Sequence, residues 1–215
     1  LDGTIYRYEP AHRAGIEAVF RVLLDRFSVA RKDSSSAYSQ AKKDTYKSLG
    51  GTASSHSKLV QIKRTLEILG FSSRFDLALE LEISYWGHFF REMELLDGCF
   101  DFLEDCREFG VPVFIVTDMT LQLQLRKLVF LGALTYCSAV LSSEEVGKDK
   151  PSREHADQLG WRYGADLSLV WVIGDSEEKD GGLSREIGGK FFLVPKTGSG
   201  GKFYGRLSKV LRESR

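Results

Sequence analysis

Apolar stretches in the second half of the chain restrict its fold more than any other feature of the sequence. Residues 111–116 form a continuous apolar run, and further mainly apolar runs follow at 139–141, 167–173 and 190–194. Helical patterns fill the intervals between them. Parallel strands are covered on both faces, so they read as unbroken apolar runs rather than as alternating ones. We therefore predict an α/β fold, with a Rossmann-like parallel sheet and helices on both faces.

The segment 9–94 has a different pattern, with no convincing strand and with apolar residues at helical spacing. We predict four amphipathic helices. The first opens at Glu9-Pro10, the second follows the possible N-caps Ser34-Ser35-Ser36, and the others cover about 57–69 and 75–93. The predicted organisation is an α/β core made of residues 1–8 and 95–215, with a helical-bundle subdomain over 9–94.

Composition excludes several classes of partner. Lys+Arg and Asp+Glu both count 30, so the net charge of zero argues against a general nucleic-acid or membrane surface. No apolar run approaches the roughly 18–20 residues that cross a bilayer. The three cysteines show no metal-ligand spacing and suit reduced thiols in a cytoplasmic protein. The pattern fits a monomer or a homodimer, without nucleic acid or membrane as partner.

Polar residues follow the predicted strands, where ligands of parallel sheets bind. Taken singly, each could be a helix cap, a turn residue or a solvated loop lysine. Together they offer hard carboxylate ligands that suit Mg²⁺, with a hydroxyl and an ammonium group that can hold a phosphoryl group. The pattern indicates phosphoryl transfer on a small phosphorylated molecule. The clusters are Asp2-Gly3-Thr4, Thr117-Asp118, Lys150-Pro151, Gly174-Asp175-Ser176 and Asp180.

These clusters resemble the four motifs of the haloacid-dehalogenase-like superfamily. Leu1-Asp2-Gly3-Thr4 matches its Asp-x-Asp-Gly-Thr motif except for the leading aspartate. The run 113–117 matches an apolar strand that ends in Ser or Thr. Lys150-Pro151 matches the lysine motif, and Gly174-Asp175-Ser176 with Asp180 matches the last one. The helical insertion is similar to the cap of the phosphoglycolate-phosphatase-like branch.

The resemblance implies a role for Asp2 and for the residue before it. Asp2 would act as general acid/base, and its backbone carbonyl would bind Mg²⁺. An aspartate directly before Leu1 would be the nucleophile that forms an aspartyl-phosphate. An acid at Asp2 also favours phosphate-ester chemistry over dehalogenation, because a halide leaves without a proton donor.

The resemblance assigns the other roles to the later motifs. Thr117 and the backbone amide of Asp118 would hold the phosphoryl oxygens, and Lys150 would neutralise charge on the nucleophile and phosphate. Asp175 would bind Mg²⁺, and Asp180 would support the metal or orient Lys150.

The loop 50–58 of the helical insertion is the candidate for substrate recognition. Ser55, His56 and Lys58, with Arg64 on the next helix, offer donors to a polyhydroxylated or anionic substrate. The alternative is a flexible connection with ordinary capping serines.

The function that fits these features is that of a Mg²⁺-dependent phosphomonoester hydrolase with a phosphorylated metabolite, a sugar phosphate first, as substrate. A nucleotide would be another phosphorylated substrate. Two other functions remain: a phosphomutase, which returns the phosphoryl group to the sugar, and a non-catalytic phosphate-binding protein.

Overall fold

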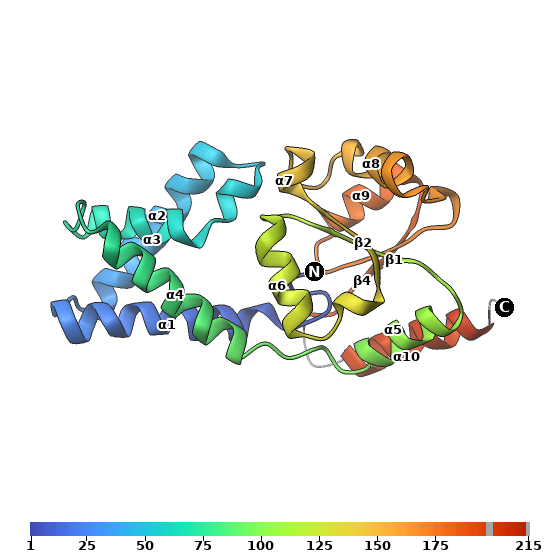
Figure 1. Cartoon of the computed structure of the whole chain (residues 1–215), viewed down its shortest axis with the longest axis horizontal. Coiled ribbons are helices and arrows are strands. Elements are labelled where there is room, and N and C mark those ends of the chain that lie inside the picture. Colours follow the sequence, from blue (N-terminus) through green and yellow to red (C-terminus); the bar gives the residue numbers. More distant parts are fainter. Residues whose placement is uncertain (197–199, 214–215) are drawn as a thin grey trace. The chain divides into compact units, whose positions relative to one another are not determined.

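The computed structural model describes residues 1–196 and 200–213. The chain forms two compact units (Figure 1). One, the α/β unit, consists of Leu1–Arg7 and Glu94–Arg215, and the other, the helical unit, is Tyr8–Met93. Within the described ranges, none of the helices combines the length and the apolar character needed to span a bilayer.

The strands of the α/β unit pair in parallel. Strand β1 (Val113–Thr117) pairs with β2 (Cys137–Ser142), and β3 (Trp171–Gly174) pairs with β4 (Lys190–Leu193). Parallel neighbours linked through helices are the Rossmann-like arrangement. Helices α6, α8 and α9 contact these strands, and α5 packs against α10. The helical elements of this unit are α5 (Cys99–Glu108), α6 (Leu121–Phe130), η2 (Leu134–Tyr136), α7 (Ser143–Val146), α8 (Arg153–Tyr163), η3 (Leu167–Leu169), α9 (Asp180–Ile187) and α10 (Gly200–Glu213).

The predicted single sheet is divided in the described part of the chain into two sheets of two strands each, β1-β2 and β3-β4. The N-terminal residues do not join them. They form a turn, in which the Ile5 amide donates to the Leu1 carbonyl oxygen at 3.1 Å, and only isolated bridges link Asp2 to Tyr6 and Tyr6 to Leu95. Among the described residues, therefore, no strand pairs with both β1 and β3.

The strand predicted over residues 167–173 begins later than expected. Leu167–Leu169 is a 3₁₀ turn, and β3 starts at Trp171. Its partner β4 offers four residues, Lys190–Leu193, which pair with Trp171–Gly174. The residues before Trp171 therefore lie outside strand β3, although the apolar pattern of the sequence predicted them as part of it.

Tyr204, on helix α10, connects that helix to the N-terminal turn. Its side chain is 2% exposed, and its hydroxyl donates to the Thr4 carbonyl oxygen at 2.7 Å. The ring also lies against Phe102 of α5, with centroids 5.7 Å apart. A buried tyrosine of this kind combines apolar packing with one directed hydrogen bond, so it holds the turn that carries Asp2 and Thr4.

The helical unit is built from two packed pairs of helices, α1 with α4 and α2 with α3. Leu23, Tyr85 and Phe89 are each 0% exposed and form its interior. The Tyr85 and Phe89 rings stack with centroids 5.7 Å apart, as expected for residues one helical turn apart. The elements of this unit are α1 (Tyr8–Phe27), α2 (Arg31–Leu49), η1 (Ala53–His56), α3 (Lys58–Ile68) and α4 (Phe75–Arg91).

The predicted N-caps of the second helix were wrong. Residues 34–36 lie inside α2, which begins at Arg31 with Ala30 as its N-cap. The amides of Asp33 and Ser34 donate to the Ala30 carbonyl oxygen at 2.9 and 3.0 Å. The backbone thus closes the first turn without a side-chain cap, which leaves no sequence signal of the usual kind.

His12 is a half-buried histidine in the interior of the helical unit. Its Nδ1 shares a hydrogen bond with the Tyr85 hydroxyl at 2.8 Å, and its ring stacks on Tyr8 with centroids 5.4 Å apart. Burial, assisted by the charges of Lys58 and Lys42, lowers the pKa of His12 to about 3. The imidazole is therefore neutral in the folded protein at any pH above that value.

We predict that His12 makes the helical unit sensitive to acid. Between pH 6.5 and about 3 the unfolded chain takes up a proton that the folded chain does not, so the stability falls as the pH falls. Lowering the pH from 7 to 5 should cost about 2 kcal/mol through this residue. Urea unfolding at both pH values should show that His12→Gln removes this difference. An equal acid-induced loss in the wild type and the variant would contradict the prediction.

Candidate active site

Several of the predicted site residues meet within the α/β unit. Thr117 is the last residue of β1, and Asp175 directly follows the end of β3. Lys150, on the loop between α7 and α8, places its ammonium group 3.0 Å from the carbonyl oxygen of Val116, the residue before Thr117. The same ammonium group donates to Asp180 at 2.6 Å. Residues from three separate loops therefore come together at the carboxyl ends of the strands, where parallel sheets bind ligands.

Lys150 and Asp180 form a buried ion pair, with side chains 8% and 9% exposed. Burial raises the pKa of Asp180, but the charge and the hydrogen bond of Lys150 outweigh it and bring that pKa below its ordinary value. The other oxygen of Asp180 accepts the Ser176 amide at 3.1 Å. A Cβ at Gly174 would lie 2.1 Å from Asp180 Oδ2, so this carboxylate needs glycine beside it. Asp180 thus contacts both the Lys150 ammonium group and the Ser176 backbone.

The negative charge of Asp175 is less well compensated than that of Asp180. Burial and the nearby charge of Asp180 raise its pKa above the ordinary value. Thr4 Oγ1 lies 3.5 Å from Asp175 Oδ1, at the limit of a hydrogen bond. Gly3 has a φ of +71°, and a Cβ there would lie 2.4 Å from Asp175 Oδ2. The backbone of the N-terminal turn approaches the carboxylate closely, and a hard cation would relieve its electrostatic cost.

Asp2 has two direct partners within the α/β unit. The ammonium group of Lys127 donates to both carboxylate oxygens, at 2.7 and 2.8 Å. The Tyr6 hydroxyl donates to the same carboxylate at 2.6 Å. Burial raises the pKa of Asp2, but the Lys127 charge and these hydrogen bonds bring it below the ordinary value. The carboxylate is therefore ionised and held in one orientation.

The side chain of Gln124, on α6, forms hydrogen bonds with both Thr117 and Asp118. The Gln124 side-chain amide donates to Thr117 Oγ1 at 2.6 Å and to the Asp118 carbonyl oxygen at 3.0 Å. Both Thr117 and Gln124 are buried, with 3% and 0% exposure. The end of β1 is thus fixed by hydrogen bonds before any ligand binds, as a preorganised site requires.

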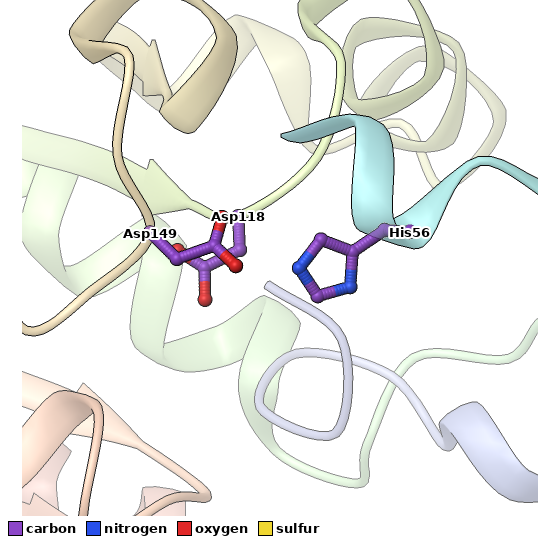
Figure 2. Close-up of side chains that lie close together, drawn as sticks. All are labelled: His56, Asp118 and Asp149. Atoms are coloured by element: carbon purple, nitrogen blue, oxygen red, sulfur yellow. The ribbon is translucent and has the colours of Figure 1, made fainter. Parts of the chain in front are cut away.

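The Asp118 side chain ties the other loops to the end of β1. Its Oδ1 accepts the Lys150 amide at 2.9 Å, and its Oδ2 accepts the Lys179 ammonium group at 2.7 Å. Lys179 also lies 3.8 Å from Asp149. Figure 2 shows the side chains of Asp118 and Asp149, each with a carboxylate oxygen within 4.8 Å of the other's. Acidic groups that could hold a cation thus lie on these loops, with Lys179 partly neutralising them.

The four candidates of the helical unit differ in burial: Ser55 and Lys58 are buried, whereas His56 and Arg64 are half-buried. Ser55 is 3% exposed and donates to the Thr52 carbonyl oxygen at 2.8 Å. Lys58 is 7% exposed, donates to Gln61 at 3.1 Å and lies over the Tyr85 ring at 5.7 Å. The guanidinium group of Arg64 donates to Ser48 at 2.9 Å. His56, labelled in Figure 2, is the last residue of η1 and is half-buried. These contacts give Ser55 and Lys58 a structural role within the unit.

Sequence reasoning missed Gln124, Lys127 and Lys179. A signal for Gln124 exists, because it falls three residues after Leu121 and four before Leu128, on the apolar face of α6. A polar residue at such a position must find a partner. Lys127 and Lys179 carry no comparable signal, since lysines on helices and loops are mostly solvated.

Comparison with known proteins gives both a family and relatives. The family described as "Hydrolase: haloacid dehalogenase-like hydrolase" matches residues 1–183 of the chain. The chain is 33% identical over 181 residues to the ribulose-1,5-bisphosphate 5-phosphatase of Halopiger xanaduensis. The aligned region covers 84% of this chain and 76% of that protein.

Solved structures share the fold. The HAD phosphatase from Thermococcus onnurineus superposes with a TM-score of 0.69 at 17% identity, over 98% of this chain and 94% of that one. A HAD-hydrolase from Bacillus subtilis, solved bound to magnesium, gives a TM-score of 0.63 at 18% identity, over 98% of this chain and 95% of that one. At such identities the likeness concerns the fold alone.

We predict that Lys150 stabilises the fold as well as the site. Lys150→Met leaves the Asp180 carboxylate buried without its counter-charge, which should lower the free energy of unfolding by about 3–5 kcal/mol. The double variant Lys150→Met/Asp180→Asn should regain most of that loss. Both values follow from urea unfolding.

The control is Lys148→Met, because the ion pair of Lys148 with Glu154 is 63% and 48% exposed. Its effect should stay within about 0.5 kcal/mol of wild type. A Lys150→Met variant as stable as the control would contradict the buried pair.

Proposed function

The chain belongs to the haloacid dehalogenase-like hydrolases and is a phosphatase of that family, and we propose that it removes phosphate from a small phosphorylated metabolite with the help of Mg²⁺. A sugar phosphate is the proposed substrate class. The relative from Halopiger xanaduensis, named as a ribulose-1,5-bisphosphate phosphatase, supports this choice. The observation that carries the proposal is the contact of the Lys150 ammonium group with the Val116 carbonyl oxygen at 3.0 Å, beside Thr117.

Lys150 and Thr117 are the proposed binding groups for the phosphoryl oxygens. An ammonium group and a hydroxyl at one strand end offer a charge and a directed donor to the same phosphoryl group. The Asp118 backbone amide, next in the chain, adds a second donor. Asp180 keeps the ammonium group in place through its 2.6 Å contact. Such preorganised donors stabilise the charge that spreads over the phosphoryl oxygens in the transition state.

The oxygen groups near Asp175 suit a hard divalent cation. The raised pKa of Asp175, caused by burial and by Asp180, marks a carboxylate whose charge is incompletely compensated. We propose Asp175 and the backbone carbonyl of Asp2 as Mg²⁺ ligands, with Asp180 supporting the site. When bound, the ion supplies positive charge to the phosphoryl group.

Asp2 is proposed as the general acid/base. Its ionised carboxylate, held by Lys127 and Tyr6, suits the activation of water in the hydrolytic half of the reaction. To act in the first half, the same group would first have to take up a proton, which it would then give to the leaving alcohol. The family motif places the nucleophilic aspartate directly before Leu1, so the covalent step requires that residue.

The helical segment 9–94 is proposed as the substrate-recognition cap. His56 and Arg64, which are half-buried, are the candidates to contact substrate. Ser55 and Lys58, being buried, would support the loop that carries them. Caps of this kind exclude water and select the leaving group.

The proposal predicts metal-dependent phosphate release by the whole protein. A panel of sugar phosphates, sugar bisphosphates and nucleotides should yield inorganic phosphate with Mg²⁺ and none after chelation with EDTA. The sugar phosphates should be the best substrates. Isomerised sugar phosphate without free phosphate would show a mutase instead. No turnover of any compound with Mg²⁺ would refute the proposed hydrolysis.

We also predict that Asp2→Asn lowers kcat by about 10²–10⁴-fold, because the amide cannot transfer the proton. The KM should change much less, since Asp2 does not bind the phosphoryl group. The matched control is Asp101→Asn, an exposed aspartate on α5 that should leave kcat unchanged. Circular dichroism checks that both variants fold. Wild-type turnover by Asp2→Asn would remove Asp2 from the mechanism.

A further inference from the structure

Helix α6 buries two polar side chains and exposes apolar ones. Gln124 and Lys127, three residues apart on one face, are each 0% exposed, whereas Val129 and Phe130 on the same helix are 62% and 51% exposed. Burying an amide or an ammonium group costs free energy unless it is well paired. Lysine is almost never fully buried without a partner. The burial of Gln124 and Lys127 therefore needs a reason. Gln124 contacts Thr117 and Lys127 contacts Asp2, and both of these contacted residues belong to the proposed active site.

The orientation of the Gln124 amide follows from its partners. A backbone carbonyl can only accept, so the side that faces the Asp118 carbonyl oxygen at 3.0 Å must be the NH₂ group. That NH₂ group also donates to Thr117 Oγ1 at 2.6 Å. The amide oxygen of Gln124 has no hydrogen-bond partner among the described residues. The burial of this side chain is thus directed at holding the end of β1.

The Gln124 contact limits what the Thr117 hydroxyl can do with its hydrogen. The Gln124 amide occupies one lone pair of Oγ1, and the contact of the Thr117 hydroxyl with the Asp118 carbonyl oxygen is long, at 3.4 Å. A hydroxyl has one hydrogen and two lone pairs. With the amide donating to it, the hydroxyl keeps its hydrogen for this long contact or for the oxygen of a ligand.

Lys127 acts on Asp2 in a parallel way. Its ammonium group is within 2.8 Å of both carboxylate oxygens, and the Tyr6 hydroxyl donates to one of them. Two donors on a carboxylate with limited exposure restrict its rotation about the Cβ–Cγ bond. The carboxylate plane is thereby fixed relative to the strand ends.

We propose that Gln124 and Lys127 of α6 are positioning residues, which orient the Thr117 hydroxyl and the Asp2 carboxylate for the reaction. This inference rests on the proposed function for the roles of Thr117 and Asp2. Neither α6 residue touches substrate. Both act through the side chain that they hold, so their effects should vanish when that side chain is removed.

A double-mutant cycle tests the Gln124 half. Gln124→Met, which keeps the volume, should lower kcat by about 10–100-fold and weaken the binding of inorganic phosphate by about tenfold. In a Thr117→Ala background the same change should alter kcat and the phosphate Kd by less than about twofold. Gln122→Met, on the exposed side of the same helix, is the matched control and should match wild type.

Lys127 is tested together with Asp2, because Lys127→Met alone leaves a buried carboxylate uncompensated and can unfold the protein. The double variant Asp2→Asn/Lys127→Met lacks both charges, and its kcat should equal that of Asp2→Asn within about twofold. Arg126→Met, exposed and adjacent, is the control.

Additive effects in the Gln124 cycle, or a kcat of Asp2→Asn/Lys127→Met well below that of Asp2→Asn, would assign these residues to general packing and overturn the proposal. The phosphate Kd, measured by calorimetry, separates this failure from that of the proposed function. A wild type without turnover refutes hydrolysis, while a non-additive Kd cycle still supports the positioning of Thr117. A wild type that fails to bind phosphate contradicts both.

Discussion

The ammonium group of Lys150 is the contact on which the arrangement of the α/β unit's loops depends. It donates to Asp180 at 2.6 Å and to the Val116 carbonyl oxygen at 3.0 Å, while the Lys150 amide is bound by Asp118. One residue thus joins the loop after β1, the loop before α8 and the start of α9. Because the pair with Asp180 is nearly excluded from water, its attraction is weakly screened, and losing one member leaves an unpaired buried charge.

Around this contact lies a layer of side chains that hold the proposed site residues. Gln124 holds the end of β1, Lys127 holds Asp2, and Lys179 holds Asp118. Hydrogen bonds in a low-dielectric interior are stronger than in water, so these side chains restrict the geometry of the groups that they contact. The scaffold therefore carries much of the orientation that phosphoryl transfer demands, before any substrate binds. Residues outside the motifs therefore contribute to the site by orienting the motif residues.

The sequence predicted the parts of this structure that depend on local pattern. The apolar runs at 111–116 and 190–194 are strands, with boundaries shifted by a residue or two, and the α/β class is confirmed. The late start of β3 was not predictable, because it depends on pairing with β4, and the start of α2 was missed because it has no side-chain cap. The roles of the motif residues remain predictions. The pairing of Asp2 with Lys127 spans 125 positions, and no spacing rule could have revealed it.

The central claim is that the carboxyl ends of the strands bind a phosphoryl group beside a divalent cation. The most direct measurement is a crystal structure of the whole protein grown with Mg²⁺ and inorganic phosphate. The account predicts phosphate oxygens within hydrogen-bond distance of the Thr117 hydroxyl and the Lys150 ammonium group, and the ion on Asp175. Phosphate bound elsewhere, or an ion held away from Asp175 with Lys150 and Thr117 untouched, would contradict it.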